Sequence, residues 1–529
     1  MPCATARAME PVRGFAAAEA SFSSLVRQLQ SSDTARMTHS DLEQLLEREG
    51  RELMRQLLQA HLDLRTQATA EGPVVGADQV SRTHARHGTR ALETIVGTVG
   101  VSRAGHGARG HTTLFPVDAA LNLPAERYSF GVRRRAAEEA TKGSFDEVVS
   151  VLGRHSGAAV AKRQVEAVVQ RAAQDFDSFY FERRLHWPVD TAASSTILVL
   201  TFDAKGVPVR HADLRPATQA AAAARQPKLS TRVSRGEKRH TRRMAQVAAV
   251  YTTAPFARTA EDIIRELGPP DAPRPVRPRP EGKRVWASLS QAPAEVIDEA
   301  FLDASSRDPQ REKHWAVLVD GNADQIARAR AAAKRHGVAV TIVLDLLHVL
   351  EYLWKAAYVF HPEGSVDAER WVRERLLWLL CGDVGQVIAS IRRTATYRGL
   401  STAARKPANA AAAYLEHHKA YLRYDQYLAA GLPIATGVIE GACRHLIRDR
   451  LTLTGARWSL AGAEAILRLR SLRASGDWDE YWHYHEAKEH DRNHTAKYAA
   501  GDVPALTPPR PATRDARRPP TTRRLRIVK

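Results

Sequence analysis

The sequence has few cysteines and no long apolar run. Three cysteines in 529 residues, Cys3, Cys381 and Cys443, exclude a disulfide framework and any zinc site built from four cysteines. No stretch approaches the ~20 apolar residues of a membrane helix, and the opening MPCATARAMEPVRGFAAAEA has no apolar core of the secretory type. The HExxH spacing of zinc hydrolases is also absent. We therefore expect a cytoplasmic protein with no membrane partner.

Acidic residues are outnumbered by basic ones. The chain has 78 Lys and Arg against 59 Asp and Glu, a net charge of +19. Such an excess favours a partner that carries many phosphates. An Ala- and Arg-rich composition of the kind that GC-rich coding produces is the alternative, so the motifs must decide between the two.

The amino-terminal part has few structural signals before a helix. We expect residues 1–37 to be weakly ordered. The segment SDLEQLLEREGRELMRQLLQAHLDLRTQ then predicts an amphipathic helix that begins with a capping box of Ser40 and Glu43. Its apolar face suits either the core of the protein or a second copy of the chain. Residues 91–103 alternate and contain glycine, which predicts a short hairpin.

Residues 144–172 predict two short helices around a Ser-Gly turn. The second helix opens near Lys162, Arg163 and Gln164, which are side chains that contact bases and phosphates in DNA complexes. This pattern is typical of a helix-turn-helix whose second helix enters the major groove. An ordinary helical hairpin looks the same, so the motif alone leaves both interpretations open.

The pattern of residue types changes near residue 195, where β-branched apolar runs begin. The expected strands are residues 195–203, 242–253, 283–290, 314–321 and 338–345. Helices separate the last three, and a Pro-rich loop at 268–282 precedes the third. A long helical stretch follows, and the basic, Pro-rich tail at 499–529 is expected to be disordered. The order predicts an α/β layer with a mixed sheet and then an all-helical block.

Three aspartates follow apolar strands. Asp203, Asp320 and Asp345 each have a structural explanation taken singly, since Asp320 is in an Asp-Gly turn pair and Asp345 can cap a helix. Three carboxylates at one rim of a sheet would repel one another unless cations lie between them. Two Mg²⁺ ions held by shared carboxylates are the usual solution in phosphoryl transfer on nucleic acids.

A glutamate in a helix completes this set. Glu440 comes one turn into the helix predicted by GLPIATGVIEGACRHLIRDRLTLTGARW, where it can reach the strand ends. Arg444, Arg448 and Arg457 follow and suit phosphate oxygens. The structural alternative for Glu440 is an acid favoured by the helix dipole. Together with the three aspartates we interpret it as a metal ligand.

Several blocks resemble bacterial insertion-sequence transposases of the ISKra type. The similar blocks are LPAERYSFGVRRRAAEEATKGSFDEV, STRVSRGEKRHTRRMAQVAAVY, VLVDGNADQI, VLDLLHVLEYLWKAA and PIATGVIEGACRHLIRDRLTLTGARW. The resemblance covers residues 38 to 498, and the last two blocks are its most specific part. These proteins are DDE transposases with a catalytic domain like ribonuclease H.

The resemblance implies a domain plan and roles for individual residues. The ranges are a mainly helical DNA-binding region (38–190), a ribonuclease H-like core (191–345), a helical insertion (346–430) and the final helices of the core (431–498). The catalytic, metal-binding acids would be Asp203, Asp320 and Glu440, and Asp345 and His348 would support the site. No acid of the pattern is missing.

The resemblance also implies a reaction and partners. Two Mg²⁺ ions, with Mn²⁺ as a substitute, would serve cleavage of double-stranded DNA at the element's inverted repeats. The freed 3′-OH would then attack target DNA, and cutting both ends together implies a homo-oligomer on DNA. Two alternatives stay open: a non-catalytic DNA-binding regulator, and a metal-dependent nuclease derived from a transposase.

Overall fold

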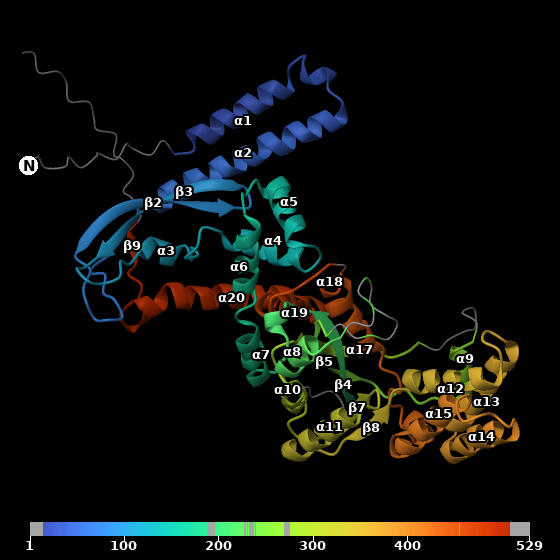
Figure 1. Cartoon of the computed structure of the whole chain (residues 1–529). Coiled ribbons are helices and arrows are strands. Elements are labelled where there is room, and N and C mark those ends of the chain that lie inside the picture. Colours follow the sequence, from blue (N-terminus) through green and yellow to red (C-terminus); the bar gives the residue numbers. More distant parts are fainter. Residues whose placement is uncertain are drawn as a thin grey trace, which may run out of the picture. The chain divides into compact units, whose positions relative to one another are not determined.

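The chain folds as two compact units. A computed structural model describes residues 14–187, 196–226, 229, 231, 237, 240–268, 276–453 and 455–507 (Figure 1). The first unit comprises Met1–Ala136, Asp146–Val165 and His483–Lys529, and the second comprises Ala137–Phe145 and Glu166–Trp482. Parts of three expected segments lie outside the described residues: 1–13 of the lead, 269–275 of the Pro-rich loop and 508–529 of the tail.

Two helices open the first unit, α1 (Ala16–Leu29) and α2 (His39–Arg65). The expectation of a weakly ordered lead is therefore wrong for α1. Its alanine-rich start favours helix, and it lies beside α2, where Ser21 Oγ donates to Gln56 Oε1 at 2.8 Å. The capping box of α2 consists of Thr38 and Asp41 rather than the predicted Ser40 and Glu43.

An antiparallel hairpin follows α2. Strands β2 (His84–Thr94) and β3 (Gly97–Gly107) pair along their whole length, so the hairpin predicted at 91–103 exists but is longer. Only its inner half is in a core, which consists of Leu62, Leu92, Val99, Val101 and Leu123. A second small sheet pairs β1 (Thr69–Ala70) with β9 (Leu506–Thr507) and so ties the carboxy-terminal part of the chain to the first unit.

Short helices connect the hairpin to the sheet of the second unit. They are α3 (Pro116–Ala120), α4 (Phe130–Ala140), α5 (Phe145–Ser156), α6 (Lys162–Ala172) and α7 (Phe176–Leu185). Helices α5 and α6 confirm the helix pair predicted within 144–172. Gly157, at φ +64°, forms the turn after α5, a conformation that glycine adopts without strain.

The second unit is built on a five-stranded mixed sheet. Its order is β6 (Glu281–Ser288), β5 (Arg242–Thr253), β4 (Ile197–Pro208), β7 (His314–Val319) and β8 (Thr341–Leu344). The β6, β5 and β4 strands are antiparallel neighbours, whereas β4, β7 and β8 run parallel. The five expected strands and the mixed sheet are therefore confirmed. Uncharged β-branched runs such as ILVLTF are buried, as a central strand requires.

Helices join and flank these strands. They are α8 (Pro216–Ala223), α9 (Ala260–Glu266), α10 (Pro293–Arg307) and α11 (Ala323–His336). Helix α10 packs against β5 and β4, and α11 against α10. The α10 and α11 helices lead into β7 and β8, which is the βαβ arrangement that parallel strands require.

A helical block follows β8, as predicted for residues 346–430. It consists of α12 (Leu346–Phe360), α13 (Val366–Leu380), α14 (Val384–Tyr397), α15 (Lys406–His417) and α16 (Tyr424–Ala429). Two tyrosines tie it to the strand ends. The Tyr414 hydroxyl donates to the Asp320 carbonyl at 2.9 Å, and the Tyr424 hydroxyl to the Leu344 carbonyl at 2.8 Å.

The last helices are split between the two units. They are α17 (Gly437–Ala442), a π-helical turn (Cys443–Arg448), α18 (Asp449–Leu451), α19 (Leu460–Ser475) and α20 (Trp478–Asn493). From His483 onward α20 belongs to the first unit, whereas residues 166–187 belong to the second. The units therefore interleave along the chain and do not follow the expected boundaries at 190 and 498. Within the described residues no helix has the length and apolar character to cross a bilayer.

Candidate active site

The three aspartates lie toward one edge of the sheet, although Asp203 is inside β4, which continues to Pro208, and not at the strand end that the sequence predicted. The last pairs of the two parallel ladders are Thr201–Leu318 and Val319–Leu344. Continuing the first register by two residues aligns Asp203 with Asp320, and continuing the second by one residue aligns Asp320 with Asp345. Parallel strands end at the same edge, so residues far apart in sequence become neighbours there.

Asp345 is the most deeply buried of these acids. Its exposed fraction is 0%, and it is the N-cap of α12. Oδ1 accepts from the Leu347 amide at 3.3 Å and the Thr436 amide at 3.1 Å. Oδ2 accepts from the Thr436 hydroxyl at 2.7 Å and from His348 Nδ1 at 2.8 Å. Four donors thus satisfy a charge that would be costly to bury alone.

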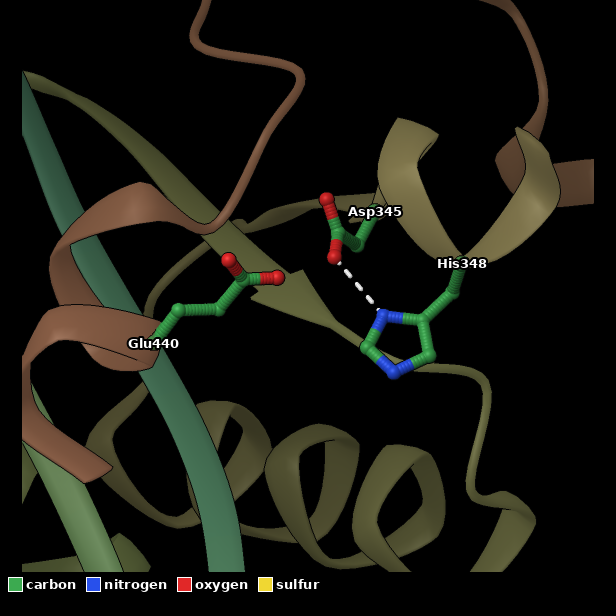
Figure 2. A group of neighbouring side chains, drawn as sticks. All are labelled: Asp345, His348 and Glu440. Atoms are coloured by element: carbon green, nitrogen blue, oxygen red, sulfur yellow. Dashed lines mark hydrogen bonds and ion pairs between the residues drawn. The ribbon is translucent and has the colours of Figure 1, made fainter. Parts of the chain in front are cut away.

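Asp345, His348 and Glu440 form a group that could hold a metal ion. Each offers one ligand atom, and these atoms all lie within 4.8 Å of one another. Figure 2 shows the Glu440 carboxylate, from α17, pointing toward the other two side chains at the start of α12. Because Nδ1 of His348 faces a carboxylate, that nitrogen carries the hydrogen, which leaves Nε2 as the atom for a ligand.

The charges of this group perturb one another. The hydrogen bond to Asp345 raises the pKa of His348 against the opposing effect of burial, and the charges of Asp345 and Asp320 add to the rise. Burial raises the pKa of Glu440, and the negative charges of Asp345 and Asp203 also raise it, while His348 and Lys205 oppose them. Carboxylates that repel in this way create a demand for a bound cation.

Asp203 is held by the helix that carries Glu440. The thiol of Cys443, in the π-helical turn, donates to Asp203 Oδ2 at 3.1 Å. Lys205 Nζ lies 3.0 Å from the same oxygen. Burial and the charge of Asp203 both raise the pKa of Cys443, so the thiol stays protonated and acts as a donor. The π-helical turn is a feature often found at functional sites.

Asp320 is at the turn after β7. Its Oδ1 accepts from the Asn322 amide at 2.9 Å, which is the turn role expected of an Asp-Gly pair. Its charge acts on Lys205 and on His348, whose pKa values it raises. The second carboxylate oxygen, Oδ2, is in no recorded protein hydrogen bond among the described residues.

The structure thus groups the expected site residues in two sets. Within the described residues, the ligand atoms that lie within 4.8 Å of one another belong to Glu440, Asp345 and His348; Asp203 and Asp320 are not in that group. The supporting pair therefore lies closer to Glu440 than the expected catalytic pair does. Sequence reasoning missed Thr436, Lys205 and Cys443. The Asp-x-Lys spacing on a strand, which puts both side chains on one face, could have indicated Lys205.

The expected DNA-contacting residues are exposed. Arg444, Arg448 and Arg457 reach solvent near α17, and Arg444 lies 3.8 Å from Asp449. Lys162, Arg163 and Gln164 are exposed at the start of α6, where Lys162 forms an ion pair of 2.6 Å with Asp146. The side chains are therefore accessible to a ligand, and Lys162 would have to exchange a carboxylate for a phosphate.

The donor set limits the metal. Carboxylate oxygens suit Mg²⁺ and Mn²⁺, whereas an imidazole nitrogen suits zinc and other transition ions. Each carboxylate oxygen of Asp345 already accepts two hydrogen bonds from protein donors. Among the described residues, the group that could hold a metal ion is Asp345, His348 and Glu440, and two carboxylates with one imidazole do not single out one metal. A scan against models of known protein families finds no match for this chain, and no curated protein matches it.

Proposed function

We propose that the protein is a DDE transposase, which cleaves DNA at the ends of a mobile element and joins the freed ends to target DNA with the help of divalent metal ions. The group of Asp345, His348 and Glu440, with Asp203 and Asp320 aligned with Asp345 by the register of the parallel strands, carries this proposal. The mixed sheet with a helical block between β8 and α17 is what the resemblance implies for a ribonuclease H-like core. The excess of basic residues supports a nucleic-acid substrate.

In this proposal the chain's residues divide the work. Asp203, Asp320 and Glu440 would hold two Mg²⁺ ions, which when bound activate the attacking oxygen and stabilise charge on phosphorus. Lys205 holds Asp203 in place through the contact of 3.0 Å. Asp345 is a positioning residue: its bond of 2.8 Å to Nδ1 of His348 leaves Nε2 as an additional metal ligand beside Glu440. Water would break the phosphodiester at the element end, and the 3′-OH released would displace a 3′-oxygen in the target strand.

Magnesium-dependent nicking by the full chain tests the proposal. Asp203→Asn, Asp320→Asn and Glu440→Gln should each abolish cleavage of duplex DNA while leaving gel-shift affinity largely intact. Glu369→Gln, an exposed acid in the first turn of α13, is the matched control and should cleave as the wild type does. Cleavage by all three acid variants would refute the assignment of the site.

The product ends separate the two alternative functions. A nuclease would cut without joining, whereas a transposase would also give strand-transfer products on a target plasmid. A regulator would bind DNA without cutting it in Mg²⁺ or Mn²⁺. The DNA that flanks the gene should carry matched inverted repeats, and these repeats should serve as the preferred substrate in both assays.

A further inference from the structure

The outer half of β2, in the β2–β3 hairpin, is exposed in a way that core packing does not explain, whereas Arg103 and Gly105 on the facing part of β3 are buried. The first six residues of β2, from His84 to Thr89, are exposed in succession, although alternate residues of a strand usually face a core. This stretch contains His84, Arg86 and His87 and no acidic residue. Six residue pairs at ~3.4 Å per residue give a ribbon about 20 Å long, with Arg86 and Arg103 on the same face.

One face of this outer half is a basic groove. Opposite residues of the antiparallel pair share a face, and in the register His84 is opposite Gly107, Arg86 opposite Gly105, and Gly88 opposite Arg103. Each cation therefore has a glycine across from it, so no side chain covers it from the other strand. The residues after β3 close the far side, and the resulting cavity measures about 580 Å³.

The floor of the groove is fixed and its walls carry unpaired charge. Arg103 lies 4.3 Å from the centre of the Phe115 ring and donates through Nε to Asp118 at 2.9 Å. None of the residues that line the groove is acidic. Within the described residues no carboxylate forms an ion pair with Arg86 or Arg109. An open groove with cationic walls and no acid is suited to a phosphodiester backbone.

We infer that the outer half of the β2–β3 hairpin binds the phosphate backbone of duplex DNA, with Arg86 and Arg109 as the phosphate contacts. The segment around Leu114 pairs with β3 at His106, so the phosphate backbone would lie along the open groove that Arg86 and Arg109 line. The inference rests on the proposed function, because it names a second DNA contact of the same protein. It is distinct from the contact expected at the start of α6.

The glycines give a sharp test of groove occupancy. A Cβ at Gly88 meets no atom within 4 Å, and its φ lies outside the left-handed region, so a side chain fits there without strain. Gly88→Glu adds a carboxylate opposite Arg103, and Gly88→Gln adds the same bulk without charge. Arg86→Ala with Arg109→Ala removes the two expected contacts. Arg328→Ala with Arg370→Ala removes the same charge from α11 and α13 and is the control.

The experiment measures binding of the full chain to a fluorescein-labelled duplex of random sequence over a series of salt concentrations. For the Arg86/Arg109 double variant we expect about tenfold weaker binding and a salt dependence shallower by about two units of slope. Gly88→Glu should weaken binding more than Gly88→Gln, and the control should bind as the wild type does. Thermal melts unchanged from the wild type show that the exposed substitutions leave the fold intact.

The outcomes separate this inference from the proposed function. Wild-type affinity and salt slope in the Arg86/Arg109 and Gly88→Glu variants would overturn the inference, while Mg²⁺-dependent nicking would leave the proposed function standing. Weaker binding with normal nicking at saturating DNA would support both. Binding without nicking, lost in the hairpin variants, would support the hairpin contact and refute the transposase. A wild-type chain that binds no duplex would overturn both.

Discussion

Replacing Asp345 tests whether this residue orients the site or only caps a helix. In Asp345→Ala the amides of Leu347 and Thr436 lose their acceptor. A buried unsatisfied donor costs ~1–3 kcal/mol. Thr436 is buried and the Leu347 amide is half-buried, so we expect a loss of about 3 kcal/mol in the free energy of unfolding. Urea unfolding followed by circular dichroism measures it.

Asp345→Asn separates orientation from stability. The backbone amides of Leu347 and Thr436 can only donate, so the side-chain oxygen of the new asparagine must face them. Its NH₂ group therefore faces the Thr436 hydroxyl and His348 Nδ1. Nδ1 then becomes an acceptor, and the hydrogen moves to Nε2, which can no longer bind a metal ion. We expect stability within about 1 kcal/mol of the wild type but Mn²⁺ affinity ~10–100-fold lower, measured by titration calorimetry.

Asp383 provides the matched control. It is also the N-cap of a helix, α14, but its side chain is exposed and forms no capping hydrogen bond. Asp383→Ala should therefore leave both stability and Mn²⁺ affinity unchanged. Wild-type stability in Asp345→Ala would refute the role of the four hydrogen bonds. Wild-type Mn²⁺ affinity in Asp345→Asn would refute the orientation of His348.

Two further predictions concern pH. Glu440→Gln should stabilise the metal-free protein near neutral pH, because burial and the charge of Asp345 raise the pKa of Glu440. The gain should vanish as the pH falls through that pKa. Equal urea midpoints of the variant and the wild type at neutral pH would contradict this prediction. Burial raises the pKa of Asp303, but the charges of Arg307 and Arg284 outweigh burial and leave this pKa low. The ionised Asp303 therefore contributes to the free energy of unfolding above the pKa of the unfolded state, and this contribution is lost as the pH falls through the pKa of the folded state. Asp303→Asn should therefore cost ~3–5 kcal/mol at neutral pH and much less in strong acid, as measured by urea unfolding.

The strands and the acids that follow them could be predicted from sequence because the signals are local. A run such as ILVLTF is apolar and β-branched, which predicts a buried strand, but β4 continues past Asp203 to Pro208, so the charge does not mark the strand's end. The full length of the β2–β3 hairpin was missed for the opposite reason. The outer half of β2 is exposed on both faces, so the apolar alternation that signals a strand is absent there.

The hydrogen bonds that occupy the carboxylates could not all be predicted, because some of the donors are far away in the sequence. Two of the four donors to Asp345 come from Thr436, which is 91 residues away along the chain. Nothing near Asp345 in the sequence indicates that its oxygens are already in use. The helix α1 was missed because its apolar side chains are few, and α2 supplies much of the packing surface that stabilises it.

The hydroxyls of Tyr414 and Tyr424 make the helical block between β8 and α17 a part of the sheet's own architecture. Each donates a hydrogen bond to a main-chain oxygen at a strand end: the Asp320 carbonyl after β7, and the Leu344 carbonyl, next to Asp345, on the edge strand β8. A shortened derivative that joined residue 345 directly to residue 431 would strip those tips of their donors and let the acidic turns drift. A chain that has lost this block should therefore hold Asp320 and Asp345 less firmly.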